Sequence, residues 1–423
     1  MAAAEHENRS AEEGAAKESI WSLAFGILLA TNFFQSMSAF MANATLPLYA
    51  DSVGVRASMV GVIISAFALT ALLIRPFAGP AFDSFSRKKM LMGAQGIIAL
   101  AFISYGFAKT VPALIAVRLL HGIGIGCAGP LGMSLVSEYL PRSRFASGVS
   151  IYMIAQSVAQ VIGPAVGLVL IEIIGFQFTY LISAAFLCAS ILCIGMLTEV
   201  PREKPPYKIK LNRMFAREAF EPSIVLMLFA AAFGGTTSYL VLYATKLGIT
   251  NIGLYFTAYA ICLLVTRPVF GRLADRFGAE RILIPGVLCF AASYLILPHI
   301  TNLTGLISVA LVAACGFGSC VPLIQSIAMG SVSIERRGAA SNTTFTGMDI
   351  GSLLGPLLAG GAIEVLEPAM GSLLSAYSHM WYVMIIPQAL AFILILKWNI
   401  SKKKTLAETA VNEKGEAHES SDD

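Results

Sequence analysis

The chain has 423 residues and a formal net charge of +4, and 57% of its residues are hydrophobic whereas only 13% are charged. Soluble domains carry about 25% charged residues, so a water-soluble fold could not cover this much apolar surface. The positive charge lies in short segments between apolar runs rather than in one basic patch, which argues against a nucleic-acid partner.

Apolar runs of membrane-spanning length recur along the whole chain. A helix needs about 20 apolar residues to cross roughly 30 Å of hydrocarbon, and the runs predict an all-α membrane protein with twelve transmembrane helices. Because the runs recur, they are not a single cleaved signal peptide. The predicted spans are 20–46, 58–79, 89–109, 112–138, 146–172, 176–197, 221–243, 251–271, 281–300, 304–331, 339–366 and 375–397.

Polar segments divide these spans into two groups of six. The two ends of the chain have few large apolar groups, so we expect them to be disordered. A segment rich in Pro, Lys and Arg separates the two groups and is expected to be a linker. The predicted domains are a cytoplasmic tail (1–18), an N-terminal six-helix bundle (19–198), a cytoplasmic linker (199–220), a C-terminal six-helix bundle (221–398) and a second cytoplasmic tail (399–423).

The positions of Lys and Arg predict the orientation in the membrane. Cytoplasmic loops carry an excess of these residues. If both termini are cytoplasmic, most of the 29 basic residues lie on that side, and only Arg56, Lys109 and Lys246 lie in the opposite loops. We therefore predict a multi-pass protein of the plasma membrane, the inner membrane of a bacterial cell, with both termini in the cytoplasm.

The sequence offers no pattern for an enzyme, a cofactor or a metal site. It has no Ser/His/Asp set, no His-x-x-x-His spacing and no Walker loop. The seven cysteines all fall within apolar runs and lack metal-ligand spacing, so we interpret them as packing residues.

Several landmarks occur twice, always at the same spacing along the chain. Arg75-Pro76-Phe77-Ala78-Gly79 returns as Arg267-Pro268-Val269-Phe270-Gly271, and Gly163-Pro164 returns as Gly355-Pro356. A period this long is too large for a solenoid unit. The repeat indicates that one half of the chain is a duplicate of the other.

Twelve spans in two duplicated halves resemble the major facilitator superfamily. The segments 79–89 and 271–278 look like its Gly-x-Leu-Ala-Asp-Arg-x-Gly-Arg-Lys loop, although Ser84 and Ser86 stand where the family favours Arg and Gly. The resemblance implies two pseudo-symmetric bundles that rock about a central site. It also implies a cytoplasmic latch between the bundles, and the alternative is that these charges only set the topology. The latch residues would be Gly79, Asp83, Arg87, Gly271, Asp275 and Arg276.

Small residues form a ridge along the fifth and eleventh spans. Such ridges let membrane helices approach closely, and packing alone would explain them. A Gly-Pro pair in the fifth span also resembles the antiporter motif of the drug:proton antiporter branch. Arg118-Leu119-Leu120-His121-Gly122-Ile123-Gly124 is similar to that branch's Arg-x-x-Gln-Gly-x-Gly, with His121 in place of Gln. The resemblance favours export. The motif residues on the ridges are Gly163, Pro164, Gly167, Gly351, Gly355 and Pro356.

Ionisable side chains within a span are costly and often mark a transport pathway. Asp349 lies in the eleventh span, on the face opposite the glycine ridge. Arg118 and His121 share one face of the fourth span. We hypothesise that these three residues handle protons and substrate, because a buried carboxylate and an imidazole can both carry a proton. The alternative for Asp349 is a structural hydrogen bond to a neighbouring helix.

These features predict a secondary active transporter, a proton-coupled exporter of a small amphiphilic drug, metabolite or metallophore. The alternatives are a proton-coupled uptake symporter for an organic anion or other metabolite, and a receptor or scaffold without transport. The expected partners are the substrate, protons and the lipid bilayer, and we expect a monomer. The candidate cavity residues are Asn32, Gln35, Tyr239, Tyr243, Gln325 and Asn342.

Overall fold

A computed structural model describes residues 20–141, 145–199, 201, 206–207, 214–333 and 336–398. The predicted tails at 1–18 and 399–423 lie outside the described residues, as does part of the predicted linker. At a few helical positions, Gly79, Asp83 and Asp275 among them, only the backbone is described.

The first half contains six helices in five continuous elements. The last element is two helices that meet at Gly175, which adopts a φ of 78° and breaks the helical path. A positive φ is easily adopted only by glycine, so the chain can turn here between two apolar segments. The elements are α2 (Leu23–Ser52), α3 (Ala57–Ser84), α4 (Arg87–Tyr105), α5 (Val111–Tyr139) and α6 (Phe145–Gly195).

The second half repeats this arrangement. A helical stretch at 385–398 follows the last named helix after a turn at residue 384. The elements are the short helix η3 (Arg217–Ala219), α7 (Phe220–Lys246), α8 (Gly253–Phe277), α9 (Ala279–Ile296), the short helix η4 (Leu297–His299), α10 (Leu303–Gly330), α11 (Arg337–Met370) and α12 (Leu373–Val383).

Ten helical segments of the described chain are long and apolar enough to cross a membrane. One of them, Ile151–Gly195, includes the break at Gly175 and counts as two crossings. α4 is not among the ten, and its first turn holds Arg87, Lys88 and Lys89. With α4 added and α6 divided, the helices account for the twelve predicted spans, and the predicted all-α membrane fold is confirmed.

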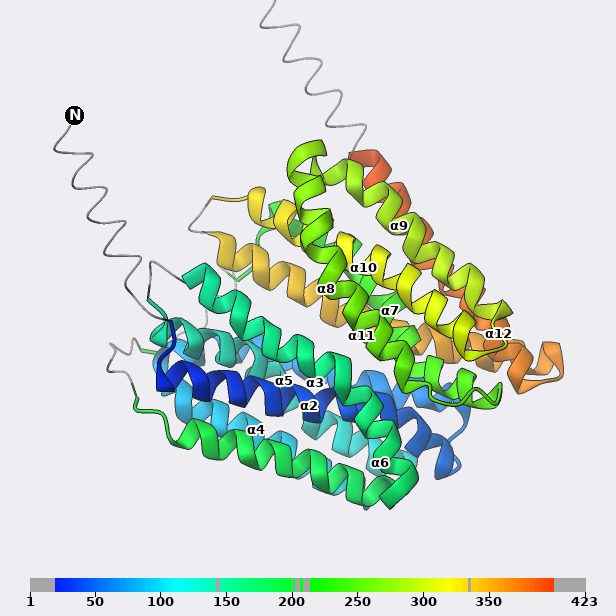
Figure 1. The fold of residues 1–423 in the computed structure, drawn as a ribbon, viewed down its shortest axis with the longest axis horizontal. Coiled ribbons are helices and arrows are strands. Elements are labelled where there is room, and N and C mark those ends of the chain that lie inside the picture. Colours follow the sequence, from blue (N-terminus) through cyan, green and yellow to red (C-terminus); the bar gives the residue numbers. More distant parts are fainter. Residues whose placement is uncertain are drawn as a thin grey trace, which may run out of the picture.

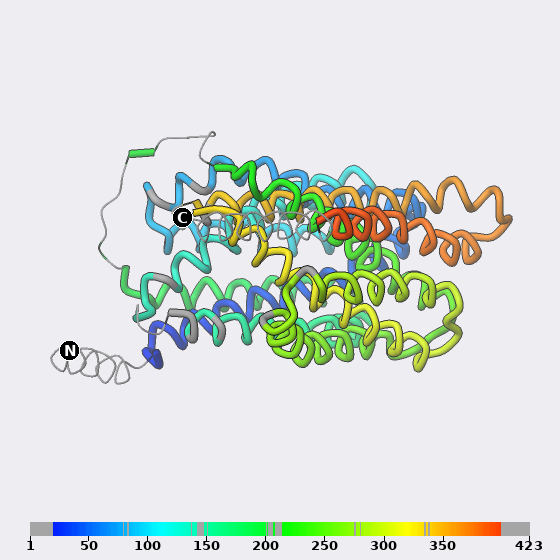
Figure 2. The backbone as a smooth tube through the Cα atoms, turned by 90° about the horizontal axis from the view of Figure 1, so that it is seen from above, coloured from blue at the N-terminus to red at the C-terminus, as the bar shows by residue number. Residues whose placement is uncertain are grey.

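The helices alternate in direction, so their ends gather at two opposite faces. We call the face near residues 20 and 398 the tail face, and the opposite one the far face. The two bundles lie side by side and diverge toward the tail face (Figure 1). Along one edge of the molecule α11 lies beside α3, and along the other α8 lies beside α6 (Figure 2).

The first latch loop turns without a glycine. Ser86 is the N-cap of α4, and its side chain accepts a hydrogen bond from the Lys89 backbone N–H. Serine is a favoured N-cap because its oxygen satisfies a free N–H of the first turn. At the equivalent position of the second loop, Gly278 has a φ of 89°. The two loops therefore join their helices in different ways, one with a serine N-cap and the other with a glycine at positive φ.

The glycine ridges pack against neighbouring helices of their own half. A Cβ added at Gly163 would lie 2.9 Å from the Cβ of Phe40, and one at Gly167 would lie 3.0 Å from the Cα of Met41. In the second half, a Cβ at Gly355 would run into the carbonyl oxygen of Ala231. Helix α6 thus packs closely on α2, and α11 packs on α7, as small residues in membrane helices allow.

Candidate functional site

Asp349 forms an ion pair with Arg75, which belongs to the other half of the molecule. The Arg75 Nη2 donates a hydrogen bond of 3.1 Å to Asp349 Oδ1, and the Arg75 Nε pairs with Oδ2. Both side chains are 18% exposed. Phe345, one turn before Asp349, places its ring 5.6 Å from the guanidinium carbon of Arg75. Helix α11 therefore holds the Arg75 side chain through both a charge and an aromatic face.

Arg118 and His121 lie inside the first half, away from this ion pair. They are 2% and 3% exposed. The His121 Nδ1 lies 3.1 Å from the Tyr105 hydroxyl and 3.5 Å from Arg118 Nη1. The Arg118 guanidinium carbon lies 4.8 Å from the centre of the Phe67 ring. Within the described chain no carboxylate forms an ion pair with Arg118, so the three predicted coupling residues form two separate groups.

Two of the predicted cavity residues are bonded within the first half. The Asn32 side chain donates a hydrogen bond of 2.8 Å to the Tyr152 carbonyl. Gln35 accepts a bond of 2.7 Å from the side chain of Gln95. These two hydrogen bonds join α2 to α6 and α4.

The predicted cavity residues of the second half also have protein partners. The Tyr243 hydroxyl donates to the Pro298 carbonyl at 3.4 Å, and the Asn342 amide donates to the Met214 carbonyl at 3.0 Å. The Gln325 amide lies 3.7 Å from a methionine sulfur of α11. None of these three side chains, nor Asn32, Gln35 or Tyr239, lines the cavity described below.

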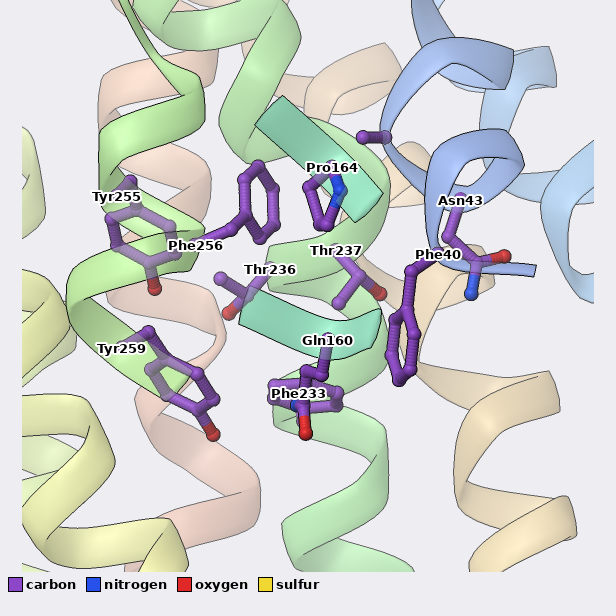
Figure 3. A pocket seen from close by; sticks show the side chains of 11 residues that line it. Phe40, Asn43, Gln160, Pro164, Phe233, Thr236, Thr237, Tyr255, Phe256 and Tyr259 are labelled. Atoms are coloured by element: carbon purple, nitrogen blue, oxygen red, sulfur yellow. The ribbon is translucent and has the colours of Figure 1, made fainter. Parts of the chain in front are cut away.

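A cavity of about 100 Å³ lies between the halves and is lined by α2, α6, α7 and α8. Side chains of α8 lie on one side and those of α2 on the other, with residues of α7 between them (Figure 3). The aromatic lining residues lie on apolar helices, where sequence alone does not separate them from core residues. The lining residues are Phe40, Asn43, Ala44, Gln160, Pro164, Phe233, Thr236, Thr237, Tyr255, Phe256 and Tyr259.

Tyr239 joins the two halves near the far face. Its hydroxyl donates a hydrogen bond of 2.9 Å to the Ala57 carbonyl and accepts one of 2.8 Å from the Gly61 N–H. An undistorted α-helix would pair these two backbone groups with each other. The hydroxyl of α7 is thereby fixed to the first turn of α3. Further out, Lys246 and Asp51 form an ion pair of 3.4 Å between the halves.

The two edges between the halves are built alike. A Cβ added at Gly61 of α3 would meet the carbonyl oxygen of Pro356 in α11. A Cβ at Gly253, the equivalent residue of α8, would lie 2.8 Å from the Cα of Ala165, the neighbour of Pro164 in α6. Each Gly-Pro helix therefore packs on a glycine of the opposite half.

The contacts described for Arg87 and Arg276 of the latch loops lie within their own halves. Arg87 pairs with Glu138 at 2.9 Å and donates to the Phe82 carbonyl at 3.1 Å, both within the first half. Arg276 stacks on Phe277 at 5.2 Å. A Cβ at Gly271 would meet no atom within 4 Å. The side chains of Asp83 and Asp275, and the surroundings of Gly79, lie outside the described part of the chain.

The sequence matches the Major Facilitator Superfamily over residues 28–255 and again over 223–418. The chain belongs to the major facilitator superfamily. It is therefore a multi-pass membrane transporter of this family and not an enzyme, and the predicted resemblance to the family is confirmed.

Relatives of this superfamily protein include transporters with and without a described cargo. It is 28% identical to the uncharacterized MFS-type transporter YuxJ of Bacillus subtilis, over 78% of this chain and 88% of that protein. It is 25% identical to the staphylopine export protein of Staphylococcus aureus, over 57% and 63% of the two chains. It is 24% identical to the multidrug resistance protein MdtG of Escherichia coli, over 75% and 82%.

Solved structures confirm the fold. A mutant form of the nucleoside transporter NupG superimposes with a TM-score of 0.75 at 14% identity, over 88% of this chain and 99% of that one. A bacterial homologue of the lysosomal transporter Spinster, in an inward-facing and unoccupied conformation, gives a TM-score of 0.72 at 17% identity, over 91% and 97%. At these identities the likeness concerns the fold alone.

Proposed function

We propose that this protein is a secondary active transporter that exports a small amphiphilic organic compound in exchange for protons. The observation that carries the proposal is the Arg75–Asp349 ion pair, which joins the two halves between two candidate membrane-spanning helices. A carboxylate at this place can exchange a proton, and its charge decides whether the pair exists. Protonation of Asp349 would release Arg75, and loss of the proton would restore the pair.

In the proposed cycle, proton release and proton uptake by Asp349 alternate with loading and release of the cargo. With both termini in the cytoplasm, as the positive charges predict, the tail face is cytoplasmic and the far face is external. In the present conformation the far face is held by Tyr239 and by the Lys246–Asp51 pair. Asp349, having released its proton to the cytoplasm, pairs with Arg75 while cargo is loaded. Opening of the far face exposes Asp349 to external protons as cargo leaves.

Two further observations support export. The relatives include proteins named for staphylopine export and for multidrug resistance. The Gly163-Pro164 pair lies on a ridge that packs against α2, and Pro164 also lines the cavity. The Arg118–His121 group lies apart from the ion pair, and we propose that it tunes the coupling from within the first half.

The test is transport driven by a pH gradient in proteoliposomes, with ethidium and carboxyfluorescein as cationic and anionic amphiphilic probes. Asp349→Asn should abolish gradient-driven transport, and Arg118→Ala and His121→Gln should each reduce it. Glu364→Gln serves as a matched control, because it removes an exposed acid from the same helix.

The outcomes separate the alternatives. Unchanged gradient-driven transport in Asp349→Asn, Arg118→Ala and His121→Gln would contradict proton coupling through these residues. Movement of probe and protons in the same direction would contradict exchange and support an uptake symporter.

A further inference from the structure

Two of the seven cysteines lie side by side on different helices of the second half. Cys262 belongs to α8 and Cys315 to α10, and their Sγ atoms are 3.9 Å apart. The Cys262 thiol also donates a weak hydrogen bond of 3.6 Å to the Leu311 carbonyl, one turn before Cys315. Both thiols are free, and both residues are half-buried. We call these two residues the thiol pair.

A close contact between the two helices brings the sulfur atoms together. A Cβ added at Gly318 of α10 would lie 2.5 Å from the Cδ2 of Leu263 and 2.9 Å from the Oγ1 of Thr266, both on α8. Glycine thus lets α10 approach α8 closely just beyond the thiol pair. A disulfide needs about 2.05 Å between its sulfur atoms, so the two sulfurs must approach by a further ~2 Å. Rotation of the two cysteine side chains can provide part of this approach while the helices stay packed.

The thiol pair lies close to the lipid-facing surface of the second half. Ile261 and Val265 on α8 are 51% and 62% exposed, and Leu311 on α10 is 44% exposed. Both helices are candidate membrane spans, and apolar side chains exposed on such spans face the hydrocarbon of the bilayer. Charged solutes enter hydrocarbon poorly. Reagents that dissolve in the bilayer can therefore reach the pair more easily than the charged reductants of the cytoplasm.

The pair is not part of a larger metal-binding group. Within the described chain, no three His, Cys, Asp or Glu side chains lie close enough together to hold one metal ion. Two adjacent thiols can instead form a disulfide through a sulfenic acid. The disulfide carries no charge, which suits a site surrounded by hydrocarbon.

We propose that Cys262 and Cys315 are an oxidisable thiol pair, which a lipid-soluble hydroperoxide converts into a disulfide between α8 and α10. In the first step, the Cys262 sulfur bonds to the terminal peroxide oxygen, the O–O bond breaks, and the thiol proton leaves with the other oxygen as an alcohol. In the second step, the Cys315 sulfur bonds to the Cys262 sulfur, the S–O bond breaks, and the Cys315 proton leaves with that oxygen as water. The two thiols are oxidised, and the hydroperoxide is reduced to one alcohol and one water.

The disulfide would hold α8 against α10. Helix α8 also packs on α6 of the first half at Gly253, so oxidation would fix the inner neighbour of a helix that lies at the boundary between the halves. Because α8 and α10 belong to the same half, the bond would not tie the halves together. The inference goes beyond the proposed function and depends neither on proton coupling nor on the direction of transport.

The test treats the full protein in lipid nanodiscs with cumene hydroperoxide, a lipid-soluble oxidant. The remaining thiols are then counted by mass tagging of the unfolded chain. We expect the reversible loss of two of the seven thiols, with all of them recovered after reduction by a phosphine. Mass spectrometry of the digested protein should find one linked peptide pair, which contains Cys262 and Cys315.

Three serine variants test the assignment. Cys262→Ser and Cys315→Ser should each slow the reversible loss of thiols about tenfold or more, because the second thiol is no longer held beside the first. Cys289→Ser is the matched control, since Cys289 is a half-buried cysteine on the neighbouring helix α9. This variant should react as the unaltered protein does. Equal slowing by all three substitutions, or a linked peptide that contains Cys289, would overturn the assignment.

A second measurement needs neither an oxidant nor a variant. Phenylarsine oxide condenses with two adjacent thiols, forming two As–S bonds and releasing one water. It should block Cys262 and Cys315 against tagging with one arsenic per chain, and 2,3-dimercaptopropanol should release them. If the arsenical leaves both thiols open to tagging, or if the hydroperoxide forms no disulfide between them, the inference is wrong.

Discussion

Asp349 and Arg75 are oppositely charged residues that meet across the two halves of a membrane protein. Each side chain is 18% exposed, so both are largely removed from water. In such surroundings a paired charge is tolerated and an unpaired one is costly. The pair therefore couples the charge state of one carboxylate to the relative position of α3 and α11.

Removing one partner of this pair should cost more than removing both. We expect Asp349→Asn alone to lower the free energy of unfolding by about 1–3 kcal/mol, because Arg75 is left unpaired. Arg75→Gln combined with Asp349→Asn should recover at least half of that loss. Unfolding in mixed micelles, analysed as a double-mutant cycle, measures the coupling. Simple addition of the two single costs would show that the residues do not interact.

The sequence identified one member of this pair and not its partner. Asp349 is conspicuous because it is an acid within an apolar span. Arg75 is visible only as part of a repeated motif, and its partner lies on a helix far along the chain. The cavity was missed for another reason. Phe233, Tyr255 and Tyr259 are aromatic residues in apolar helices, as many core residues are. Only the packing of the four helices around them shows that they line the cavity.

The glycine ridges act at the scale of whole helices. On α11, Gly351 and Gly355 each face a backbone carbonyl of α7. When two helices are in direct backbone contact, a methyl group added between them forces one of the helices to move. The ridge therefore fixes α11 to α7, so that the two helices would move together in the rocking motion that the proposed function requires.

A matched pair of glycines on α11 tests this contact. A Cβ at Gly355 would collide with the Ala231 carbonyl, whereas one at Gly361 would meet no atom within 4 Å. We expect Gly355→Ala to lower the free energy of unfolding by about 1–3 kcal/mol, the usual range for overpacking. Gly361→Ala should be neutral or slightly stabilising, because alanine favours helix. Equal effects of the two substitutions would contradict a role for close contact.

The sequence predicts where the spans lie, but not the residues at which the helices begin and end. The run of apolar residues predicts each span, and Ser86 and Thr110 cap the helices that follow them. The separation of Arg118 and His121 from Asp349 could not be predicted. Helical periodicity gives the face of a helix on which a residue lies, but not which neighbour covers that face.

At the scale of the molecule, the two halves meet along two edges that are equivalent by the internal repeat. One edge is α3 with α11 and the other is α8 with α6. Arg267 on α8 is the repeat of Arg75, and Ser157 on α6 is the repeat of Asp349. Ser157 bonds to the Met153 carbonyl of its own helix instead. The edge between α3 and α11 thus has an acid, Asp349, at the position where the edge between α8 and α6 has Ser157. The two edges share their packing but differ in charge.

Ser157→Asp should give the second edge the charge pair that the first one has. The new carboxylate would face Arg267 as Asp349 faces Arg75, and would stabilise the conformation in which the far face is closed. We expect far-face opening to fall about twofold to fivefold, as for a pair worth roughly 0.5–1 kcal/mol. The measurement is labelling of a cysteine introduced at Asn43 in the cavity, by an impermeant thiol reagent added from the far side, in a background without native cysteines. Ser157→Asn controls for shape, and adding Arg267→Gln to Ser157→Asp should restore opening. If Ser157→Asn slows labelling as much as Ser157→Asp does, the effect is steric, and the two edges do not share the charge geometry that their common origin predicts.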